Sequence, residues 1–309
     1  MTDSVPTLSF RDVGSDAFAR AIGDAYGRYG FVIVTDHGIP QPLIDRFLDL
    51  YRRFFALPTA AKQAYRIPGG GGARGYTPFG IETAKGATHH DLKEFWHVGR
   101  ELAAGHPHRQ YMRDNIWVDE LPGFRECSLE MFEACDATGR SLLRAIARSL
   151  SLPDDFFEDK VEQGNSVLRV IHYPPVPPQP TASVRAGAHE DINVITLLLG
   201  ADEPGLQVLT RQGEWLAVNP APGAMVVNVG DMLQRLTNGV LRSTTHRVVN
   251  PARERASHAR FSMPYFLHFN PDFVIDALPS CVGPDRPRQW PPIMAEDYLH
   301  ERLLEIKLK

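Results

Sequence analysis

Two histidines and an aspartate in the second half of the chain have the residue types and the spacing of a metal site. His189 and Asp191 are separated by one residue, and His246 follows in the segment Thr244–Val249. We expect both segments to be strands, on which residues two apart point to the same side. Two histidines and one carboxylate occupy one face of an octahedron and leave three cis positions open, which is typical of non-haem Fe(II) oxygenases. His189, Asp191 and His246 are therefore predicted to bind one Fe(II) that activates O2.

Other interpretations of these residues stay open, because a His-x-Asp pair often occurs by chance. His189 could lie in a turn, and His246 could be a hydrogen-bonded core histidine. Zinc is an alternative metal, since three protein ligands plus a water also describe a catalytic zinc site, and the chain would then be a hydrolase. A non-catalytic small-molecule sensor is a further alternative. A fourth histidine, His172, alternates with Tyr173 on its predicted strand and is assigned to packing or to the surface.

A second pair of residues predicts a site for an anion. Arg260 and Ser262 are two apart on a predicted strand, the next strand after His246. An arginine can form a bidentate pair with a carboxylate, and the serine can donate a third hydrogen bond. Tyr173 could add a hydroxyl group. The alternative for Arg260 is an ordinary surface salt bridge, because Arg-x-Ser alone is a weak signal.

The elements that must position these residues change character along the chain. The first half has the helical spacing of apolar residues over Asp16–Tyr29, Gln41–Ala56 and Gly123–Leu152, with a short predicted strand at Phe31–Val34. Met294–Leu308 is again helical in pattern. Short β-rich runs separated by turn residues occupy the second half: Val167–Tyr173, Val194–Leu199, Leu206–Leu209, Trp215–Val218, Ala224–Val229, Thr244–Val249 and Arg260–Phe269. In front of His246, the segment Asn228–Gln234 is expected to be strand and then turn.

Many short strands with regular turns favour a sandwich or jelly roll. The fold class that we predict is α+β and mainly β, a double-stranded β-helix core with a helical N-terminal layer and flanking helices. Residues 1–309 are expected to form a single compact unit of four regions. These are a mixed helical and strand region at 1–120, a long packing helix region at 121–165, the oxygenase core at 166–275 and a helical tail at 276–309.

The overall composition favours a small-molecule substrate. The net charge is −4, whereas a protein that binds nucleic acid usually has a basic surface. The longest apolar runs, such as Val194–Gly200, are far shorter than the roughly 20 residues of a membrane span. The N-terminus lacks the pattern of a secretory signal. Three scattered cysteines do not make a disulfide framework, so we expect a cytoplasmic protein with neither nucleic acid nor membrane as a partner.

Several ordered motifs resemble those of one enzyme family. The motifs are Tyr29–Ile39, Phe54–Pro58, Asp91–Phe95, Tyr173–Pro175, His189-x-Asp191, His246–Asn250 and Arg260-x-Ser262. Together they resemble the isopenicillin N synthase-like branch of the 2-oxoglutarate/Fe(II)-dependent dioxygenase superfamily, over nearly the whole chain.

The resemblance implies roles for individual residues and a reaction. It implies His189, Asp191 and His246 as iron ligands, and Arg260, Ser262 and Tyr173 as the residues that hold 2-oxoglutarate. Phe266 matches an aromatic residue over the substrate pocket, with plain core packing as the alternative. The implied reaction is hydroxylation, desaturation or cyclisation of a small organic metabolite, with O2 as cosubstrate, release of succinate and CO2, and ascorbate as an accessory reductant. A 2-oxoglutarate-independent Fe(II) oxidase of the isopenicillin N synthase type is the alternative within the family.

The sequence also departs from the family pattern. Many relatives have an asparagine that touches 2-oxoglutarate where this chain has Ile171, so that contact must be missing or supplied elsewhere. The stretch between His246 and Arg260 is a few residues longer than in plant members, and Arg253–His258 within it is expected to form an extended hairpin. With Gly69–Gly80 and Thr88–Trp96, this hairpin is expected to surround the substrate. The polar residues there, His89, His90, Lys93 and His97, could offer positive or hydrogen-bonding groups to the substrate, but we assign them to solvated loops or to buried structural positions. The oligomeric state stays open.

Overall fold

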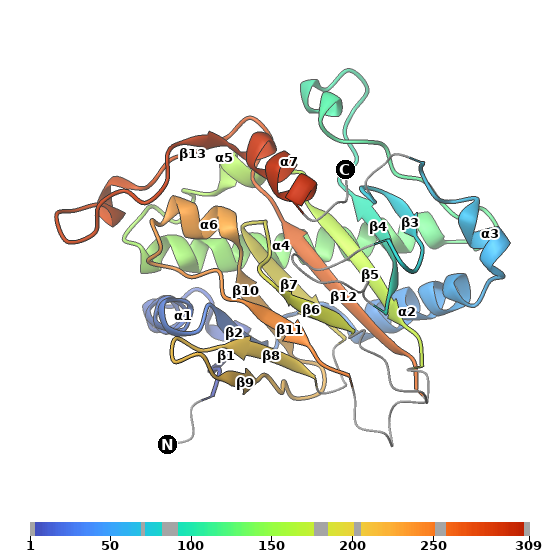
Figure 1. Ribbon diagram of the computed structural model, residues 1–309, viewed down its shortest axis with the longest axis horizontal. Coiled ribbons are helices and arrows are strands. Elements are labelled where there is room, and N and C mark those ends of the chain that lie inside the picture. Colours follow the sequence, from blue (N-terminus) through green and yellow to red (C-terminus); the bar gives the residue numbers. More distant parts are fainter. Residues whose placement is uncertain are drawn as a thin grey trace.

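The computed structural model describes residues 4–68, 72–81, 92–175, 185–200, 205–250 and 258–305. Two facing sheets form the double-stranded β-helix that we predicted (Figure 1). The large sheet has eight strands, in the order β1 (Thr7–Ser9), β2 (Phe31–Thr35), β10 (Met225–Val229), β7 (Ile195–Leu199), β12 (Arg260–Leu267), β5 (Val167–Tyr173), β4 (Glu94–Gly99) and β3 (Gly75–Thr77). The small sheet has the order β6 (Ala186–His189), β11 (His246–Val248), β8 (Leu206–Leu209) and β9 (Trp215–Ala217).

Seven α-helices surround the sheets in the described part of the chain. They are α1 (Asp16–Arg28), α2 (Gln41–Phe55), α3 (Thr59–Gln63), α4 (Phe124–Ser149), α5 (Glu158–Val161), α6 (Asp231–Leu236) and α7 (Ala295–Glu305). A short pair, β13 (Val274–Ile275) and β14 (Ile293–Met294), precedes α7. None of the described helices is long and apolar enough to cross a bilayer.

The two faces of the large sheet have different duties, because side chains alternate along each strand. On β5, Leu168 and Val170 join the main hydrophobic core, whereas Arg169, Ile171 and Tyr173 line a cavity on the other face. The same alternation holds on β12 and β7. A slip of one residue would exchange the two sets, so the register of this sheet is strongly specified.

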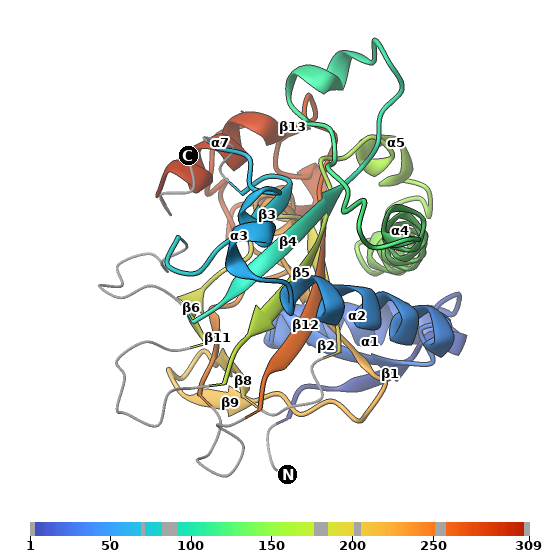
Figure 2. The same cartoon turned by 90° about the vertical axis from the view of Figure 1, so that its right-hand side faces the viewer.

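The helical layer covers the core face of the large sheet. Figure 2 shows α4 and α1 on one side of the sheet and the small sheet, with β6, β11 and β8, on the other. The N-terminus of α1 is capped by Ser15, whose side chain accepts a hydrogen bond from the Phe18 amide at 3.1 Å. The long helix α4 packs against α1, α2, β12 and β7, which makes it the support of the sheet from behind.

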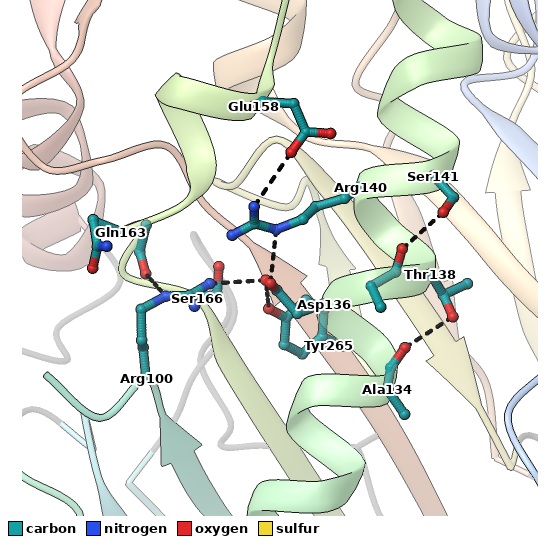
Figure 3. A network of polar contacts seen from close by, with 12 residues as sticks. Arg100, Ala134, Asp136, Thr138, Arg140, Ser141, Glu158, Gln163, Ser166 and Tyr265 are labelled. Carbon is teal, nitrogen blue, oxygen red and sulfur yellow. Dashed lines mark hydrogen bonds and ion pairs between the residues drawn. The ribbon is translucent and has the colours of Figure 1, made fainter. Parts of the chain in front are cut away.

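A buried carboxylate ties α4 to the strand β12 (Figure 3). Asp136 on α4 accepts hydrogen bonds from Arg100 at 2.8 Å, Arg140 at 2.8 Å and the Tyr265 hydroxyl at 2.6 Å. Arg140 continues to Glu158 on α5 at 3.4 Å. Burial raises the pKa of Tyr265 well above its ordinary value, so the hydroxyl remains a donor to Asp136.

The strands of the second half are confirmed to within one or two residues at each end. One sequence expectation about these elements is wrong. The segment after β10 is the helix α6 and not a turn, because its first amides bond back to the carbonyls of Asp191, Ile192 and Asn193. The first half also contributes β3 and β4 to the large sheet, where β4 pairs with β5 over six residues. The expected hairpin Arg253–His258 lies outside the described residues except for His258.

Replacing Asp136 with alanine is expected to destabilise the fold. The substitution removes one acceptor from each of two guanidinium groups and the acceptor of the Tyr265 phenol, and breaking a buried charge pair costs about 3 kcal/mol or more. For a chain of this size we expect a fall in Tm of roughly 5–10 °C by calorimetry or circular dichroism. Glu130→Ala is the matched control, because its ion pair with Arg46 is more than half exposed at both side chains, 57% and 54%. An unchanged Tm for Asp136→Ala would contradict the supporting role of this network.

Candidate metal centre

The structure brings three possible metal ligands together on the cavity wall: His189, Asp191 and His246. His189 ends β6 and stands directly opposite His246 on β11. One carboxylate oxygen of Asp191, Oδ1, lies 3.8 Å from His189 Nε2 and 3.9 Å from His246 Nε2. The three possible ligand atoms all lie within 4.8 Å of one another, which is the separation that a single bound ion requires.

The expectation that His189 and Asp191 share a strand is wrong. The strand β6 ends at His189, and Asp191 lies in the turn that follows. This turn is held by α6, since the amide of Asp231 donates to the Asp191 carbonyl at 2.7 Å. Asp231 in turn accepts a hydrogen bond from Tyr298 on α7 at 3.1 Å and pairs with Arg302 at 3.6 Å. The turn, and not strand alternation, therefore brings the side chains of His189 and Asp191 close together.

The second oxygen of Asp191 is held by two neighbours from the large sheet. Thr196 on β7 donates its hydroxyl to Oδ2 at 2.6 Å, and Asn228 on β10 donates its amide at 2.7 Å. Burial raises the pKa of Asp191, but the nearby His246 and His189 and these hydrogen bonds outweigh burial, so the pKa lies below its ordinary value. An ionised carboxylate with Oδ1 turned toward the histidines results.

Backbone carbonyls determine which nitrogen of each histidine faces the centre. His189 Nδ1 lies 2.7 Å from the Gly187 carbonyl, and His246 Nδ1 lies 3.1 Å from the Thr244 carbonyl. A carbonyl can only accept, so we assign the proton of each neutral ring to Nδ1, which leaves the lone pair of Nε2 toward Asp191. Burial and the neighbouring His189 lower the pKa of His246, which favours the neutral form that binds metals.

The donor set fits Fe(II). Two imidazole nitrogens and one carboxylate oxygen without a thiolate match the facial triad. The three cysteines are free and buried, and they belong to the helical core instead. A cavity of about 590 Å³ lies beside these three side chains, so an ion held by them would border a space that small molecules can enter.

The residues predicted to hold an anion line the same cavity. Arg260 and Tyr173 are register partners on β12 and β5, and the guanidinium carbon lies 5.3 Å from the centre of the tyrosine ring. Ser262 is the register partner of Ile171. Arg260 and Ser262 are each only 3% exposed. Ile171, which replaces the family's asparagine, packs with Phe95 and Tyr173 and gives this part of the wall an apolar surface.

The other candidate residues have mixed outcomes. Phe266 lines the cavity and is the register partner of Thr196. His172 packs as expected, since it stacks on Phe261 at 4.8 Å and bonds to Glu94 at 2.7 Å. Lys93 and His97 are buried, in agreement with the expected structural positions, and both also line the cavity, as the alternative role at the substrate requires. His89 and His90 lie outside the described residues.

Sequence reasoning missed Thr196 and Asn228. Each is the polar residue inside an apolar run, Val194–Leu199 and Ala224–Val229. A polar side chain at the centre of a buried strand needs a partner, so this interruption was the available signal. Sequence reasoning also missed the excess of cationic side chains on the cavity wall. The cationic side chains there are Arg74, Lys93, Arg109, Arg113, Arg169, Arg260 and Arg302, against the carboxylates Glu190, Asp191 and Glu296.

Two family models match the sequence. The 2OG-Fe(II) oxygenase superfamily matches residues 164–269, and the model described as non-haem dioxygenase in morphine synthesis N-terminal matches residues 5–120. Among curated proteins, a 2-oxoglutarate-Fe(II) type oxidoreductase, hxnY, of Emericella nidulans is 35% identical over 94% of this chain and 87% of its own length.

Solved structures agree with these sequence matches. A putative 2OG-Fe(II) oxygenase family protein from Caulobacter crescentus is 49% identical, with a TM-score of 0.92 over 99% of this chain and 100% of that chain. The full-length Neurospora crassa protein T7H in complex with alpha-KG is 30% identical, with a TM-score of 0.84 over 96% of this chain and 95% of that chain.

Replacing Thr196 with valine is expected to weaken metal binding. The substitution keeps the shape of the side chain but removes the hydroxyl that orients Asp191, and loss of such a partner lowers metal affinity by roughly 10- to 100-fold. Titration with Co(II), followed by its visible absorption, measures the change. Thr138→Val is the control, because its hydroxyl donates to the Ala134 carbonyl within α4 at 2.9 Å. Equal affinities for the two variants would mean that Asp191 keeps its orientation without Thr196.

Proposed function

The chain belongs to the 2OG-Fe(II) oxygenase superfamily, and we propose that His189, Asp191 and His246 bind its iron. It is an Fe(II)- and 2-oxoglutarate-dependent dioxygenase that oxidises a small organic metabolite and releases succinate and CO2. The 2-oxoglutarate-independent oxidase is not favoured, because the relatives are 2-oxoglutarate enzymes. The observation that carries the ligand assignment is Asp191 Oδ1, which faces both Nε2 atoms while its other oxygen is held by Thr196 and Asn228.

Arg260 is the proposed partner of the distal carboxylate of 2-oxoglutarate. Its guanidinium is buried in the cavity wall with its carbon 5.3 Å from the centre of the Tyr173 ring, and Ser262 lines the same cavity two residues further along β12. A buried guanidinium favours a bidentate carboxylate over a neutral group. Because Ile171 is apolar, we assign no polar contact to that position, and Arg260, Ser262 and Tyr173 carry the cosubstrate.

The protein's own residues position the reactants and keep water away from them. When bound, iron supplies the activation of O2 and the oxidising power. Leu198, Pro264 and Phe266 line the wall between the anion site and the metal ligands, and they exclude water from it. Phe266 is proposed to contact the primary substrate, because its register partner on β7 is Thr196, which bonds the proposed ligand Asp191.

The remaining partners are also proposals. A cavity of about 590 Å³ suits 2-oxoglutarate together with one small metabolite, and not a polymer. We propose that neither nucleic acid nor a membrane is a partner and that the protein works in the cytoplasm, where three free cysteines are ordinary. The oligomeric state is left open.

Anaerobic titration of the Fe(II)-loaded protein with 2-oxoglutarate tests the ligand assignment. A weak visible charge-transfer band is expected, because a 2-oxo acid that chelates Fe(II) gives one. His189→Ala, Asp191→Ala and His246→Ala are each expected to lose the band. His106→Ala, a histidine outside the ligand cluster, is expected to keep it. A band that persists in all three ligand variants would overturn the assignment.

Replacing Arg260 with glutamine is expected to raise the KM for 2-oxoglutarate. Loss of a charge-assisted pair costs about 1.5–3 kcal/mol, which corresponds to roughly 10- to 100-fold. The Fe(II) affinity without 2-oxoglutarate is expected to stay unchanged, since Arg260 is not a ligand. Succinate release measures the first quantity and Co(II) titration the second. A KM that does not change would remove Arg260 from the cosubstrate site.

A further inference from the structure

Arg74 is a buried cation on the cavity wall that the reaction described above does not use. The residue is 3% exposed. Its guanidinium donates to the Ala73 carbonyl at 2.7 Å and, at 3.4 Å, to the Asn165 side chain. Its Nε is buried without a hydrogen-bond partner, and among the described residues no carboxylate forms a close ion pair with it, although the charge of Asp114 acts on it from farther away. Burial lowers the pKa of Arg74 to about 10, so the group still carries its charge at neutral pH.

A glycine at position 99 leaves the space that the Arg74 guanidinium occupies. Gly99 ends β4, and a Cβ atom at this position would lie 1.9 Å from the Arg74 guanidinium carbon. Asn115 bonds both the amide and the carbonyl of Gly99 at 2.8 Å, which fixes the backbone under the guanidinium. Any side chain at Gly99 would displace Arg74 from its place against the end of β4.

The strand register places Arg74 level with the metal ligands. One row crosses the large sheet through Thr196, Phe266, Val167 and Gly99, each the register partner of the next. Asp191 lies over the first position of this row, held by Thr196, and Arg74 lies over the last. Three strand spacings separate the ends, roughly 14 Å of sheet. Phe266 and Val167 line the cavity between them.

His268 lies between these two ends. It follows Phe266 by two residues, lines the cavity and interacts electrostatically with both Asp191 and Arg74. Burial lowers the pKa of His268 to about 4, so the ring is neutral. Its Nδ1 is buried and has no hydrogen-bond partner. A neutral ring with an unused nitrogen can bond a polar group in the middle of a bound molecule.

We propose that Arg74 binds a carboxylate of the primary substrate, which is therefore a small organic acid that lies along this row with its other end at the metal centre. The inference rests on the proposed function and names its substrate class. A carboxylate matches the single charge and the planar fork of one arginine. Two other cations of the wall have acidic partners, since Arg109 pairs with Asp114 and Arg302 with Asp231. Arg260, at the opposite end of β12, is assigned to 2-oxoglutarate.

A panel of acids and their primary amides tests the substrate class. We choose phenylacetate, 4-phenylbutanoate, hexanoate and N-acetylglycine, each with its amide, at saturating 2-oxoglutarate so that the acids do not simply occupy the Arg260 site. Two readouts are taken, the stimulation of succinate release and the shift in Tm. At least one acid is expected to stimulate or to stabilise, and its amide to need a concentration at least about 10-fold higher.

Variants connect the discrimination to Arg74. Arg74→Gln is expected to raise the half-saturating concentration of that acid by roughly 10- to 100-fold, the loss of one charge-assisted pair. The KM for 2-oxoglutarate is expected to change by less than about 2-fold. Arg74→Lys keeps the charge but loses the fork, so an intermediate value is expected. Arg109→Gln is the matched control, because that guanidinium already has a carboxylate partner.

Three results would overturn the proposal: amides as effective as acids, no effect of any acid in the panel, or equal behaviour of Arg74→Gln and Arg109→Gln. If Arg74→Gln does not fold, the acid–amide difference of the unmodified protein and the Arg74→Lys variant decide. The proposed function fails separately. It fails if Fe(II) and 2-oxoglutarate give no succinate either with or without an added acid, whereas succinate formation without acid discrimination contradicts only the role of Arg74.

Discussion

The buried carboxylate of Asp191 is the interaction on which the rest of the site depends. Its two oxygens have separate duties: Oδ1 faces the histidines, and Oδ2 is bonded by Thr196 and Asn228. Those bonds come from β7 and β10 of the large sheet, whereas the histidines come from β6 and β11 of the small sheet. A single side chain therefore joins the two halves of the jelly roll. A buried charge is tolerated only where it is bonded on every side, so the carboxylate requires both sheets in register.

Alternation along the strands explains how one sheet serves both stability and chemistry. The helix-facing residues are mostly apolar, and α4 is bonded to that face through the Asp136 network. The cavity-facing residues of β5 and β12 form successive rows, from Arg260 and Tyr173 at one end to Phe266 and Val167 at the other. Each row is one step of two residues along the strand. A step of two residues along β5 or β12 therefore moves one row along the cavity wall.

Much of this arrangement could be predicted from the sequence, and the reasons are local. The period of two in the second half revealed the strands, and the types of His189, Asp191 and His246 indicated the ligand set. What the sequence did not reveal depends on contacts between distant segments. The helix α6 is one example, since its first turn is stabilised by carbonyls of the turn that carries Asp191. Arg74 is another, because its burial depends on a glycine 25 positions later that no local pattern connects to it.

The last helix contributes to the wall of the cavity, and this has a consequence for how the protein is made. Leu299, Arg302 and Leu303 of α7 line the cavity, and Arg302 and Tyr298 contact Asp231 beside the ligand-bearing turn. In the sequence α7 follows every strand of both sheets, so during synthesis His189, Asp191 and His246 emerge before the helix that supplies this part of the cavity wall.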